Sequence, residues 1–542
     1  MSRLKISTPD RAQLTVERLY KDLERHIVAS PPGLCPVDLQ LSFLKLCHAQ
    51  TCGKCVPCRI GLGQLQNLLE QVLDGTATMD TLALIEETAN NITDSADCAI
   101  GFEAAHMVLA GLQGCRDDFI YHIEHGKCSY SITQPVPCVA LCPAGVDIPG
   151  YIALVGEERY ADAVSLIRKD NPFPTACALI CEHPCEARCR RNMIDSSVNI
   201  RGLKRMAVDN ARANTVPVPP KAPSTGKRIA IAGGGPGGLS AAYYLELMGH
   251  HAVVFEQKSK LGGMLRYGIP NYRFPRERLD EDIEAILSTG VEVHTNVNIG
   301  NGENDIPLSR LREEFDAVYI AIGAHTDKKV GMEGEDAHGV ISAVEMLRSI
   351  GDGNPPDFTG KRVVVVGGGN VAMDAARTAL RLGAKVHVVY RRSEAELPAR
   401  VEEVHHAKEE GIIFNLLTNP VEILTDDNGW VKGMVVRKME LGEPDASGRR
   451  RPVEIPGSDY TIDVDAVIMS LGTSPNPLIS STTEGLETNR WKCIIADEAN
   501  GKTTKEGVYA GGDAVTGAAT VILAMEAGRA GARGIDEFLQ GK

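Results

Sequence analysis

Hydrophobic residues recur every three to four positions in three segments near the start of the chain. These segments are Leu14–Ile27, Ile60–Leu73 and Thr81–Ile92. Such spacing places the apolar side chains on one face of an α-helix, where they can pack against neighbouring helices. The pattern therefore predicts a mainly helical domain over residues 1–127.

The pattern changes after Val216–Lys227, a proline-rich and polar segment that we interpret as a linker. Beyond it, short apolar runs end in glycines and lead into helical stretches. Arg228–Ala232 precedes Gly233–Gly238, and Arg362–Val366 precedes Gly367–Gly369. This alternation predicts βαβ units on parallel sheets, and therefore an α/β fold with two similar nucleotide-binding units.

Composition narrows the function classes. The chain has 542 residues, of which 43% are hydrophobic, and a formal net charge of −14. An acidic balance disfavours nucleic-acid binding, which requires a basic face. No apolar run reaches the ~18 residues of a membrane helix, and Met1–Asp10 lacks the apolar core of a secretory signal. We expect a cytoplasmic protein with no nucleic-acid partner and no membrane span.

The first glycine-rich turn predicts a dinucleotide site. Gly233, Gly235 and Gly238 fit G-x-G-x-x-G between a strand and a helix. The glycines allow a tight turn and close approach of the pyrophosphate, which the helix N-terminus attracts. The next strand, His251–Phe255, ends at Glu256, whose carboxylate can accept ribose hydroxyls. A glycine-rich turn without a ligand is the alternative.

The second turn predicts a site for a different nucleotide. Gly367, Gly369 and Ala372 fit G-x-G-x-x-A, and the following strand ends at Arg391 and Arg392 instead of an acid. Two guanidinium groups there suit the 2′-phosphate of NADP and leave NAD without its ribose acceptor. The alternative is a pair of arginines that are merely exposed to solvent.

A third segment, Gly507–Arg529, predicts a strand that ends at Gly511-Gly512-Asp513 and is followed by a helix. We expect Asp513 to accept hydrogen bonds from the ribityl hydroxyls of a flavin. The start of the helix would face the flavin ring.

Cysteines are confined to one part of the chain. Of fifteen, fourteen lie between Cys35 and Cys189, and in a cytoplasmic chain such clustering indicates metal binding. Cys52, Cys55 and Cys58 follow C-x2-C-x2-C, a spacing that lets three thiolates hold one iron–sulfur cluster. We predict that Cys98 is the fourth ligand. A structural zinc site with the same four thiolates is the alternative.

A second group of eight cysteines supplies enough thiols for two four-iron clusters. Its members are Cys115, Cys128, Cys138, Cys142, Cys177, Cys181, Cys185 and Cys189. Beyond residue 190 the sequence has only Cys493, so it offers no dithiol for a flavin–disulfide mechanism.

The three nucleotide segments together resemble flavoproteins with two dinucleotide-binding domains. The likeness is closest to the glutamate synthase small subunit and to the large subunit of NADH-dependent ferredoxin:NADP oxidoreductase. Leu261–Pro275 (LGGMLRYGIPNYRFP) is similar to their flavin-contacting segment, and Val389–Arg400 (VYRRSEAELPAR) to their NADP loop. The resemblance covers about Cys128 to the C-terminus. It implies an FAD site at Glu256, Gly263, Asp513 and Thr520, and an NADP(H) site at Asn370, Arg391 and Arg392.

Thr51–Gly61 and Asp97–Gly101 resemble the C-terminal cluster region of the NADH-binding subunit of respiratory complex I. Both motifs and the interval between them match. The FMN and NADH domain of that subunit has no counterpart here, so we expect a cluster without a second nicotinamide site.

The second cysteine group resembles a paired-cluster domain that is also found in dihydropyrimidine dehydrogenase. The resemblance implies that Cys138 and Cys189 share one cluster, and that Cys142, Cys181 and Cys185 share the other. Cys128 stands in place of a fuller upstream motif. The family's non-cysteine ligand falls on Lys204, which cannot bind iron when protonated. Either Cys177 or Cys115 replaces it, or one cluster is lost.

The resemblance implies a fold of two Rossmann-like domains, for FAD and NADP, preceded by two mainly helical iron–sulfur domains. We expect cluster domains at 1–127 and 128–215, a linker at 216–227, an FAD domain at 228–325 and 470–542, and an NADP(H) domain at 326–469.

The implied function is that of an NADP(H)-dependent oxidoreductase subunit with FAD and three [4Fe-4S] clusters. The cofactors carry out the hydride transfer, so we predict no catalytic side chain. The family suggests an electron-bifurcating NADH/ferredoxin:NADP transhydrogenase, a hetero-oligomer with an NADH-oxidising flavin and iron–sulfur subunit or another redox subunit, and with ferredoxin as a possible partner. The alternatives are a glutamate synthase small subunit, the NADP module of a formate dehydrogenase or hydrogenase, and a cluster relay or docking scaffold without enzymatic activity.

Overall fold

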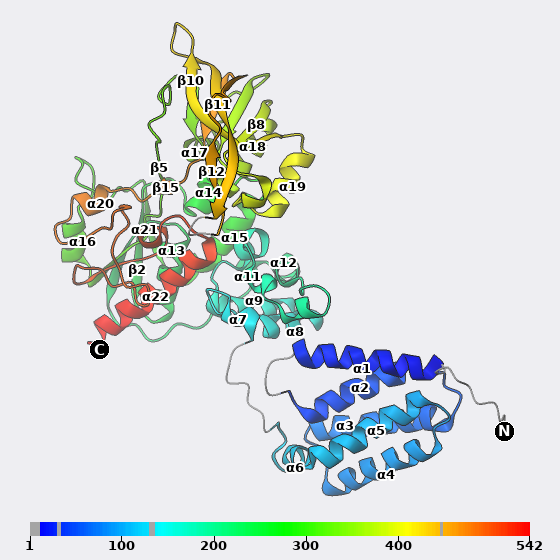
Figure 1. Cartoon of the computed structure of the whole chain (residues 1–542). Coiled ribbons are helices and arrows are strands. Elements are labelled where there is room, and N and C mark those ends of the chain that lie inside the picture. Colours follow the sequence, from blue (N-terminus) through cyan, green and yellow to red (C-terminus); the bar gives the residue numbers. More distant parts are fainter. Residues whose placement is uncertain (1–10, 30–33, 129–135, 445–447, 542) are drawn as a thin grey trace. The chain divides into compact units, whose positions relative to one another are not determined.

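The computed structural model describes residues 11–29, 34–128, 136–444 and 448–541 (Figure 1). The segment Met1–Asp10, which we expect to lack a secretory signal, lies outside them. The chain forms two compact units: residues 1–141 with 184–198, and residues 142–183 with 199–542. Among the described helices, none combines the length and the apolar character that crossing a membrane requires.

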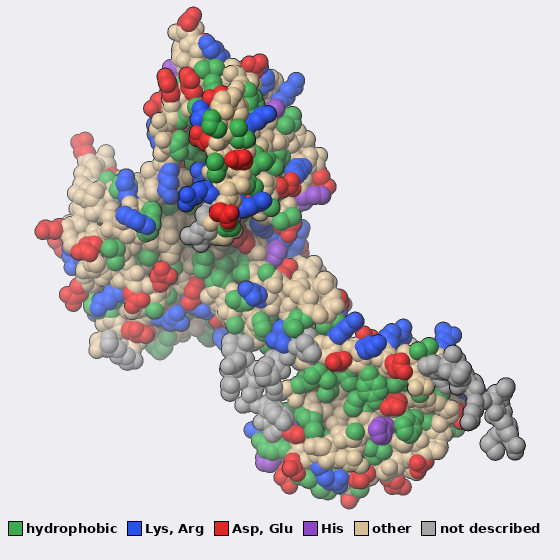
Figure 2. Space-filling view, in the orientation of Figure 1, with side chains coloured by type: hydrophobic (Ala, Val, Ile, Leu, Met, Phe, Trp, Pro, Cys, Tyr) green, Lys and Arg blue, Asp and Glu red, His purple; other side chains and the backbone are tan. Residues whose placement is uncertain are grey.

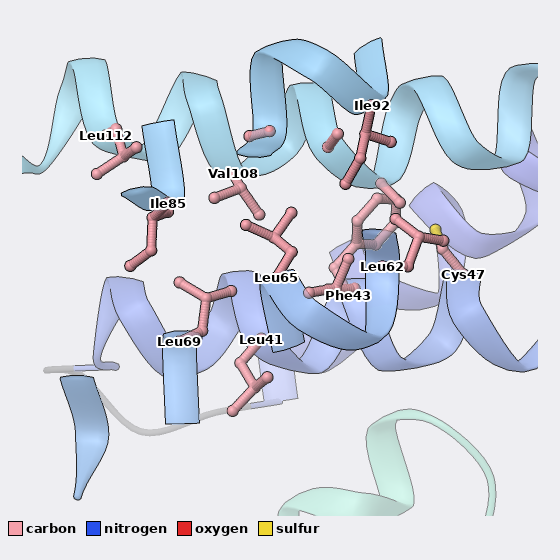
Figure 3. Packing of buried hydrophobic residues seen from close by; sticks show 14 of the residues in the cluster. Leu41, Phe43, Cys47, Leu62, Leu65, Leu69, Ile85, Ile92, Val108 and Leu112 are labelled. Atoms are coloured by element: carbon pink, nitrogen blue, oxygen red, sulfur yellow. The ribbon is translucent and has the colours of Figure 1, made fainter. Parts of the chain in front are cut away.

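The N-terminal unit is built of helices. Its main helices are α1 (Arg11–Ala29), α2 (Pro36–Ala49), α3 (Leu62–Leu73), α4 (Met79–Ser95), α5 (Ala99–Gly114) and α6 (Arg116–His125). They enclose a core in which Phe43, Leu65 and Val108 are fully buried (Figure 3). The predicted helical periodicity therefore corresponds to α1, α3 and α4. Two short helices, α7 (Pro137–Ala140) and α11 (Pro184–Ala187), also contact each other in this unit.

The second unit begins with helices that lead up to two sheets. These are α8 (Ile148–Gly156), α9 (Tyr160–Asp170), α10 (Pro174–Ile180) and α12 (Ile200–Asn210). The backbone N–H groups of Thr175 and Ala176, in the first turn of α10, donate to the Asp282 carboxylate at 3.2 and 2.9 Å. Asp282 lies on α15 (Arg276–Leu287), so the carboxylate joins α10 to the flavin-type domain.

The first sheet is five-stranded and parallel, with the order β16-β4-β1-β2-β3. Its strands are β1 (Arg228–Ala232), β2 (His251–Glu256), β3 (Glu292–Thr295), β4 (Ala317–Ile320) and β16 (Val508–Ala510). Helices α13 (Pro236–Leu247) and α22 (Val521–Leu539) pack against each other in this domain (Figure 1). The C-terminal strand β16 therefore belongs to the same sheet as β1. The remaining helices are α14 (Met264–Tyr267), α16 (Leu308–Glu314), α20 (Leu478–Ser481) and α21 (Asp513–Thr516).

The second sheet repeats this design with the order β6-β14-β7-β8-β9. Its strands are β6 (Val340–Ser342), β7 (Arg362–Val366), β8 (Lys385–Tyr390), β9 (Ile413–Leu416) and β14 (Ala466–Met469), and its helices are α17 (Ala343–Gly351), α18 (Asn370–Arg381) and α19 (Val401–Glu409). A small antiparallel sheet, which the sequence analysis did not anticipate, lies between β9 and β14 in the chain. It contains β10 (Thr418–Thr425), β11 (Val431–Pro444), β12 (Arg450–Glu454) and β13 (Tyr460–Asp463). Strands β5 (Thr326–Asp327) and β15 (Thr473–Ser474) form a separate pair.

Candidate nucleotide and metal sites

The first glycine turn is too crowded for a side chain. Gly233 follows β1 with φ +113°, and a Cβ there would lie 2.4 Å from the carbonyl oxygen of Ala321. A Cβ on Gly238, in α13, would lie 2.0 Å from the carbonyl oxygen of Gly233. The turn and its helix therefore approach each other as closely as a pyrophosphate-binding turn requires.

Glu256 ends β2 and lies against this turn. Its carboxylate accepts the N–H of Gly234 at 2.7 Å and the N–H of Lys258 at 2.8 Å. Burial raises the pKa of Glu256, while these two N–H donors act in the opposite direction. The strand end thus places an acid beside the glycine turn, where the sequence analysis predicts a ribose acceptor.

A cavity of about 490 Å³ opens beside the turn and continues along the carboxyl ends of the strands. Gly235, Glu256, Gly263 and Asp513 line it. A Cβ on Gly263 would lie 2.8 Å from the Cα of Gly235, so two bare backbone segments form one wall. These features fit an extended dinucleotide such as FAD. The cavity has a wall without side chains at one end, and a buried carboxylate (Glu256) and a partly buried one (Asp513) that can accept hydroxyl groups.

Two further predicted residues lie near the C-terminal helices. Asp513 is the first residue of α21, and burial raises its pKa to about 6. Thr520 precedes α22 and does not line the cavity, whereas Ala524, in the first turn of α22, does. The N-terminal end of α22 therefore lies at the cavity, as the sequence analysis expects for a helix that faces the flavin.

We expect the FAD affinity of the flavin-free protein to fall as the pH drops below about 6. Hydroxyl groups that donate to Asp513 favour its charged form and lower its pKa in the complex, so binding releases a proton in this range. The largest slope for one group is about tenfold per pH unit. Fluorescence titrations of wild type and Asp513→Asn measure it. Equal slopes in the two proteins would contradict the role of Asp513.

The second glycine turn repeats the geometry of the first. Gly367 follows β7 with φ +138°, and a Cβ there would lie 2.4 Å from the carbonyl oxygen of Ser470. Gly369 faces open space, because a Cβ there would have no neighbour within 4 Å among the described residues. Ala372 is fully buried in α18. The turn therefore leaves an open approach to the N-terminus of α18, which suits a phosphate.

Asn370, the first residue of α18, joins two loops. Its side-chain oxygen accepts the N–H of Arg400 at 2.9 Å, and its Nδ2 donates to Glu182 at 2.8 Å. The N–H of Ala399 donates to the carbonyl of Gly368 at 3.1 Å. The predicted NADP loop, Val389–Arg400, therefore packs against the glycine turn. Asn370 links this turn to Glu182, the residue after Cys181.

The two arginines after β8 differ in exposure. Arg391 is exposed. Arg392 is 7% exposed, and its Nε donates to the carbonyl oxygen of Arg450 at 2.8 Å. Arg450 opens β12 and itself pairs with Glu396. Arg391 is therefore the side chain that reaches solvent beside the turn, and Arg392 fixes the antiparallel sheet. The sequence analysis gave Arg391 and Arg392 the same role because it did not predict β12, the strand that Arg392 contacts.

The thiols predicted to bind the N-terminal cluster lie together. Cys58 occupies a single π-helical turn, Pro57–Gly61, and Cys98 directly precedes α5. Burial raises the pKa of Cys58 to about 12, and Cys55, Cys98 and Cys52 add to this effect. Cys52 is exposed. Hydrogen bonds from the backbone N–H groups around Cys58 and Asp97 lower the pKa of Cys55. A group with one thiol that ionises readily and others nearby suits a cationic metal centre, and π-helical turns recur at functional sites.

The second cysteine group is spread over short helices. Cys138 lies in α7 and Cys185 in α11, the two helices that contact each other. Cys142 follows α7, and Cys189 directly precedes a 3₁₀ turn. In the second unit, the Cys177 thiol donates to Cys181 and lowers its pKa, as does the charge of Lys204. Lys204 is buried, with its Nζ 5.6 Å from the centre of the Tyr151 ring. Cys177 is thus the cysteine beside Cys181 and Lys204.

Cys128 lies in a group that the sequence did not reveal. Its sulfur, the Cys35 sulfur and a ring nitrogen of His122 are all within 4.8 Å of one another. Cys35 lies 87 residues before His122, and neither is part of a recognisable spacing motif. The ligand assignments between Cys128 and Cys189 remain predictions.

These sites define a class of protein: oxidoreductases that use NADP and a flavin and carry 4Fe-4S domains. Three family models match successive parts of the chain. They are the NADH-ubiquinone oxidoreductase-F iron-sulfur binding region over residues 38–122, the dihydropyrimidine dehydrogenase domain II 4Fe-4S cluster over 122–216, and pyridine nucleotide-disulphide oxidoreductase over 227–528. The chain belongs to the pyridine nucleotide-disulphide oxidoreductase family.

The relatives confirm the resemblance seen in the sequence. The chain is 38% identical to NADPH-Fe(3+) oxidoreductase subunit beta of Geobacter sulfurreducens, over 96% of this chain and 83% of the relative. It is 34% identical to NADP(+)-dependent formate dehydrogenase subunit beta of Moorella thermoacetica, over 95% and 81%. With the Escherichia coli glutamate synthase [NADPH] small chain the identity is 35%, over 74% of this chain and 88% of the relative.

Solved structures confirm the predicted fold class. FprA of Mycobacterium tuberculosis in complex with NADPH matches 58% of this chain and 85% of its own, with a TM-score of 0.51 and 20% identity. At that identity the match concerns the fold alone.

Proposed function

We propose that this chain is the NADP(H)-binding subunit of a cytoplasmic redox complex, which relays electrons between NADP(H), FAD, three [4Fe-4S] clusters and a partner subunit. One observation carries the proposal: the chain combines both nucleotide sites with a four-thiol group whose Cys52 is exposed. Electron transfer to a partner requires such an exposed terminal centre.

The surroundings of this group support partner docking. Val56 is 56% exposed and Ile60 is 49% exposed, and both lie beside the cysteines in sequence. Phe102, four residues after Cys98, is 38% exposed. Figure 2 shows hydrophobic side chains on the visible face of the N-terminal unit. Exposed apolar residues next to a metal centre are typical of a protein–protein contact.

The finer proposal is an electron-bifurcating NADH/ferredoxin:NADP transhydrogenase. The match of residues 38–122 to the iron–sulfur region of an NADH-ubiquinone oxidoreductase subunit supports a partner that oxidises NADH. Ferredoxin would then be the third reactant.

The second candidate is the NADP module of a formate dehydrogenase or of a metal-reducing complex. The relatives with those names align with at least 95% of this chain. The glutamate synthase small chain is less well supported, because its match covers 74% of this chain.

FAD, when bound, supplies the conversion between two-electron nicotinamide chemistry and one-electron cluster chemistry. The residues of the chain bind and orient the two nucleotides. The glycine turn at Gly233 and the carboxylates of Glu256 and Asp513 form one site, and the turn at Gly367 and the guanidinium of Arg391 form the other.

Purification of the native complex without oxygen tests the proposal. A partner that carries FMN and an NADH site, with NADPH formation that requires both NADH and reduced ferredoxin, is expected for the transhydrogenase. A formate-oxidising partner, or NADPH-dependent reduction of Fe(III) by the complex, would establish the second candidate. A chain purified as a monomer, without flavin or iron, would contradict both.

Arg391→Asp should reduce kcat/KM for NADPH by about 10- to 100-fold, through KM, because a charge-assisted contact with the 2′-phosphate is lost. The preference for NADPH over NADH should fall by a similar factor. Steady-state reduction of a dye by each nucleotide measures it. Arg391 is changed alone because Arg392 is buried. Arg310→Asp, in an exposed pair of α16, is the control and should leave the preference unchanged.

A further inference from the structure

Three residues of the N-terminal unit converge where two helix ends meet. Cys35 directly precedes α2, His122 lies in the last turn of α6, and Cys128 follows the glycine that ends α6. The Cys35 sulfur is 3.2 Å from Nε2 of His122, and the Cys128 sulfur lies within 4.8 Å of both atoms. These residues are separate from the four cysteines predicted to hold the N-terminal cluster.

The surroundings favour a metal over a hydrogen-bonded cluster of thiols. His122 is 3% exposed, and its Nδ1 has no hydrogen-bond partner among the described residues. A thiol is a weak donor and a weak acceptor, so Cys35 compensates little for the burial of the imidazole. A metal ion bound at Nε2 and at two thiolates would replace this weak contact by coordination bonds, with Nδ1 carrying the ring proton.

The donor set indicates which metal. Two sulfurs and one imidazole nitrogen form a soft-to-borderline set that suits tetrahedral zinc. With Zn–S of about 2.3 Å and Zn–N of about 2.0 Å, ligand atoms in a tetrahedron lie roughly 3.5–3.8 Å apart. The Cys35 sulfur is 3.2 Å from Nε2 of His122, and the other two separations do not exceed 4.8 Å, so a small adjustment of the side chains gives this geometry. Water or one further side chain completes the tetrahedron.

We propose that Cys35, His122 and Cys128 bind a structural zinc ion that joins the start of α2 to the end of α6. This assigns Cys128 to zinc instead of to the paired clusters, for which the six cysteines from Cys138 to Cys189 then supply six of the eight ligands that two four-iron clusters need. The ion closes a loop of 87 residues between Cys35 and His122. Because such a site does not exist in the unfolded chain, its binding free energy stabilises the folded domain. The inference is independent of the proposed function.

The test uses the full chain, purified without a histidine tag and without oxygen. Elemental analysis of the wild type should give one zinc per chain. Cys35→Ser, His122→Asn and Cys128→Ser should each lose it, with iron and flavin unchanged. Cys115→Ser is the matched control, because Cys115 is partly exposed in the same unit and lies outside the group, and it should retain zinc.

Zinc K-edge absorption of the wild type tests the proposal even if the variants fail to fold. A shell of two sulfurs with nitrogen, completed by nitrogen or oxygen, supports the site. An all-oxygen or all-sulfur shell would overturn it. So would a wild type without zinc, a disulfide between Cys35 and Cys128 after alkylation under denaturing conditions, or a loss of iron instead of zinc in Cys128→Ser.

Discussion

Cys55→Ala should remove about four irons per chain and abolish electron transfer to the partner subunit, while NADPH still reduces the flavin at the wild-type rate. The thiol of Cys55 lies against Cys58 in the predicted N-terminal cluster site, and removal of one of four ligands releases or degrades a cluster. Both nucleotide sites belong to the other compact unit and do not depend on this thiol. Iron analysis and single-turnover mixing with NADPH provide the two measurements.

The control for this variant is Val56→Ala, which changes the next, exposed residue and should keep the full iron content. A loss of flavin reduction in Cys55→Ala would show that the N-terminal cluster is needed for the first transfer. Unchanged iron would show that the four thiols hold no cluster.

Arg273→Ala should cost about 3–5 kcal/mol of unfolding free energy, because it leaves the buried carboxylate of Asp374 without its ion-pair partner, whereas Glu403 keeps Arg377 and Arg400. Arg273 donates to both oxygens of Asp374 at 2.7 and 2.6 Å, and its Nε lies 3.2 Å from Glu403. Burial raises the pKa of Asp374 to about 6, although Arg273 acts against this rise. Arg273 belongs to the flavin-type domain, and both acids lie on helices of the NADP-type domain.

Calorimetry of the flavin-loaded chain measures this loss, with flavin release marking the transition of the two nucleotide domains. Arg310→Ala is the control, because solvent screens its exposed pair with Glu314 and the loss of this pair should leave the stability almost unchanged. Replacing Arg273 and Asp374 together by leucine should recover part of the loss. An Arg273→Ala protein as stable as the control would show that the buried ion pairs do not hold the domains together.

The fold and the nucleotide sites could be predicted because their signals are local. A strand, a glycine turn and a helix occupy consecutive residues, as at Arg228–Gly238 and Arg362–Ala372. At Gly233 and Gly367 the carbonyl oxygen of a distant residue leaves no room for a Cβ, but the presence of glycine in the sequence already indicates such a close approach. The helices of the N-terminal unit follow equally from periodicity within single segments.

The features that could not be predicted depend on partners far away in the chain. The burial of Arg392 results from β12, 58 residues later, and the antiparallel sheet that contains β12 has no motif of its own. Asp282 meets the N-terminus of α10 across more than 100 residues of sequence. Likewise, Cys35, His122 and Cys128 meet only because α2 and α6 pack in one core.

The hydrogen bonds around Asn370 have a thermodynamic consequence for the complex. The Asn370 side chain donates to Glu182 and accepts the N–H of Arg400, whose guanidinium donates to the carbonyl of Cys181 at 3.4 Å, so the nucleotide turn and the backbone at Cys181 share one network. If NADP(H) displaces Asn370 from Glu182, occupancy of the turn changes the reduction potential of the metal centre predicted at Cys181. Linkage requires the reverse as well: reduction of that centre must change the nucleotide dissociation constant by the same factor.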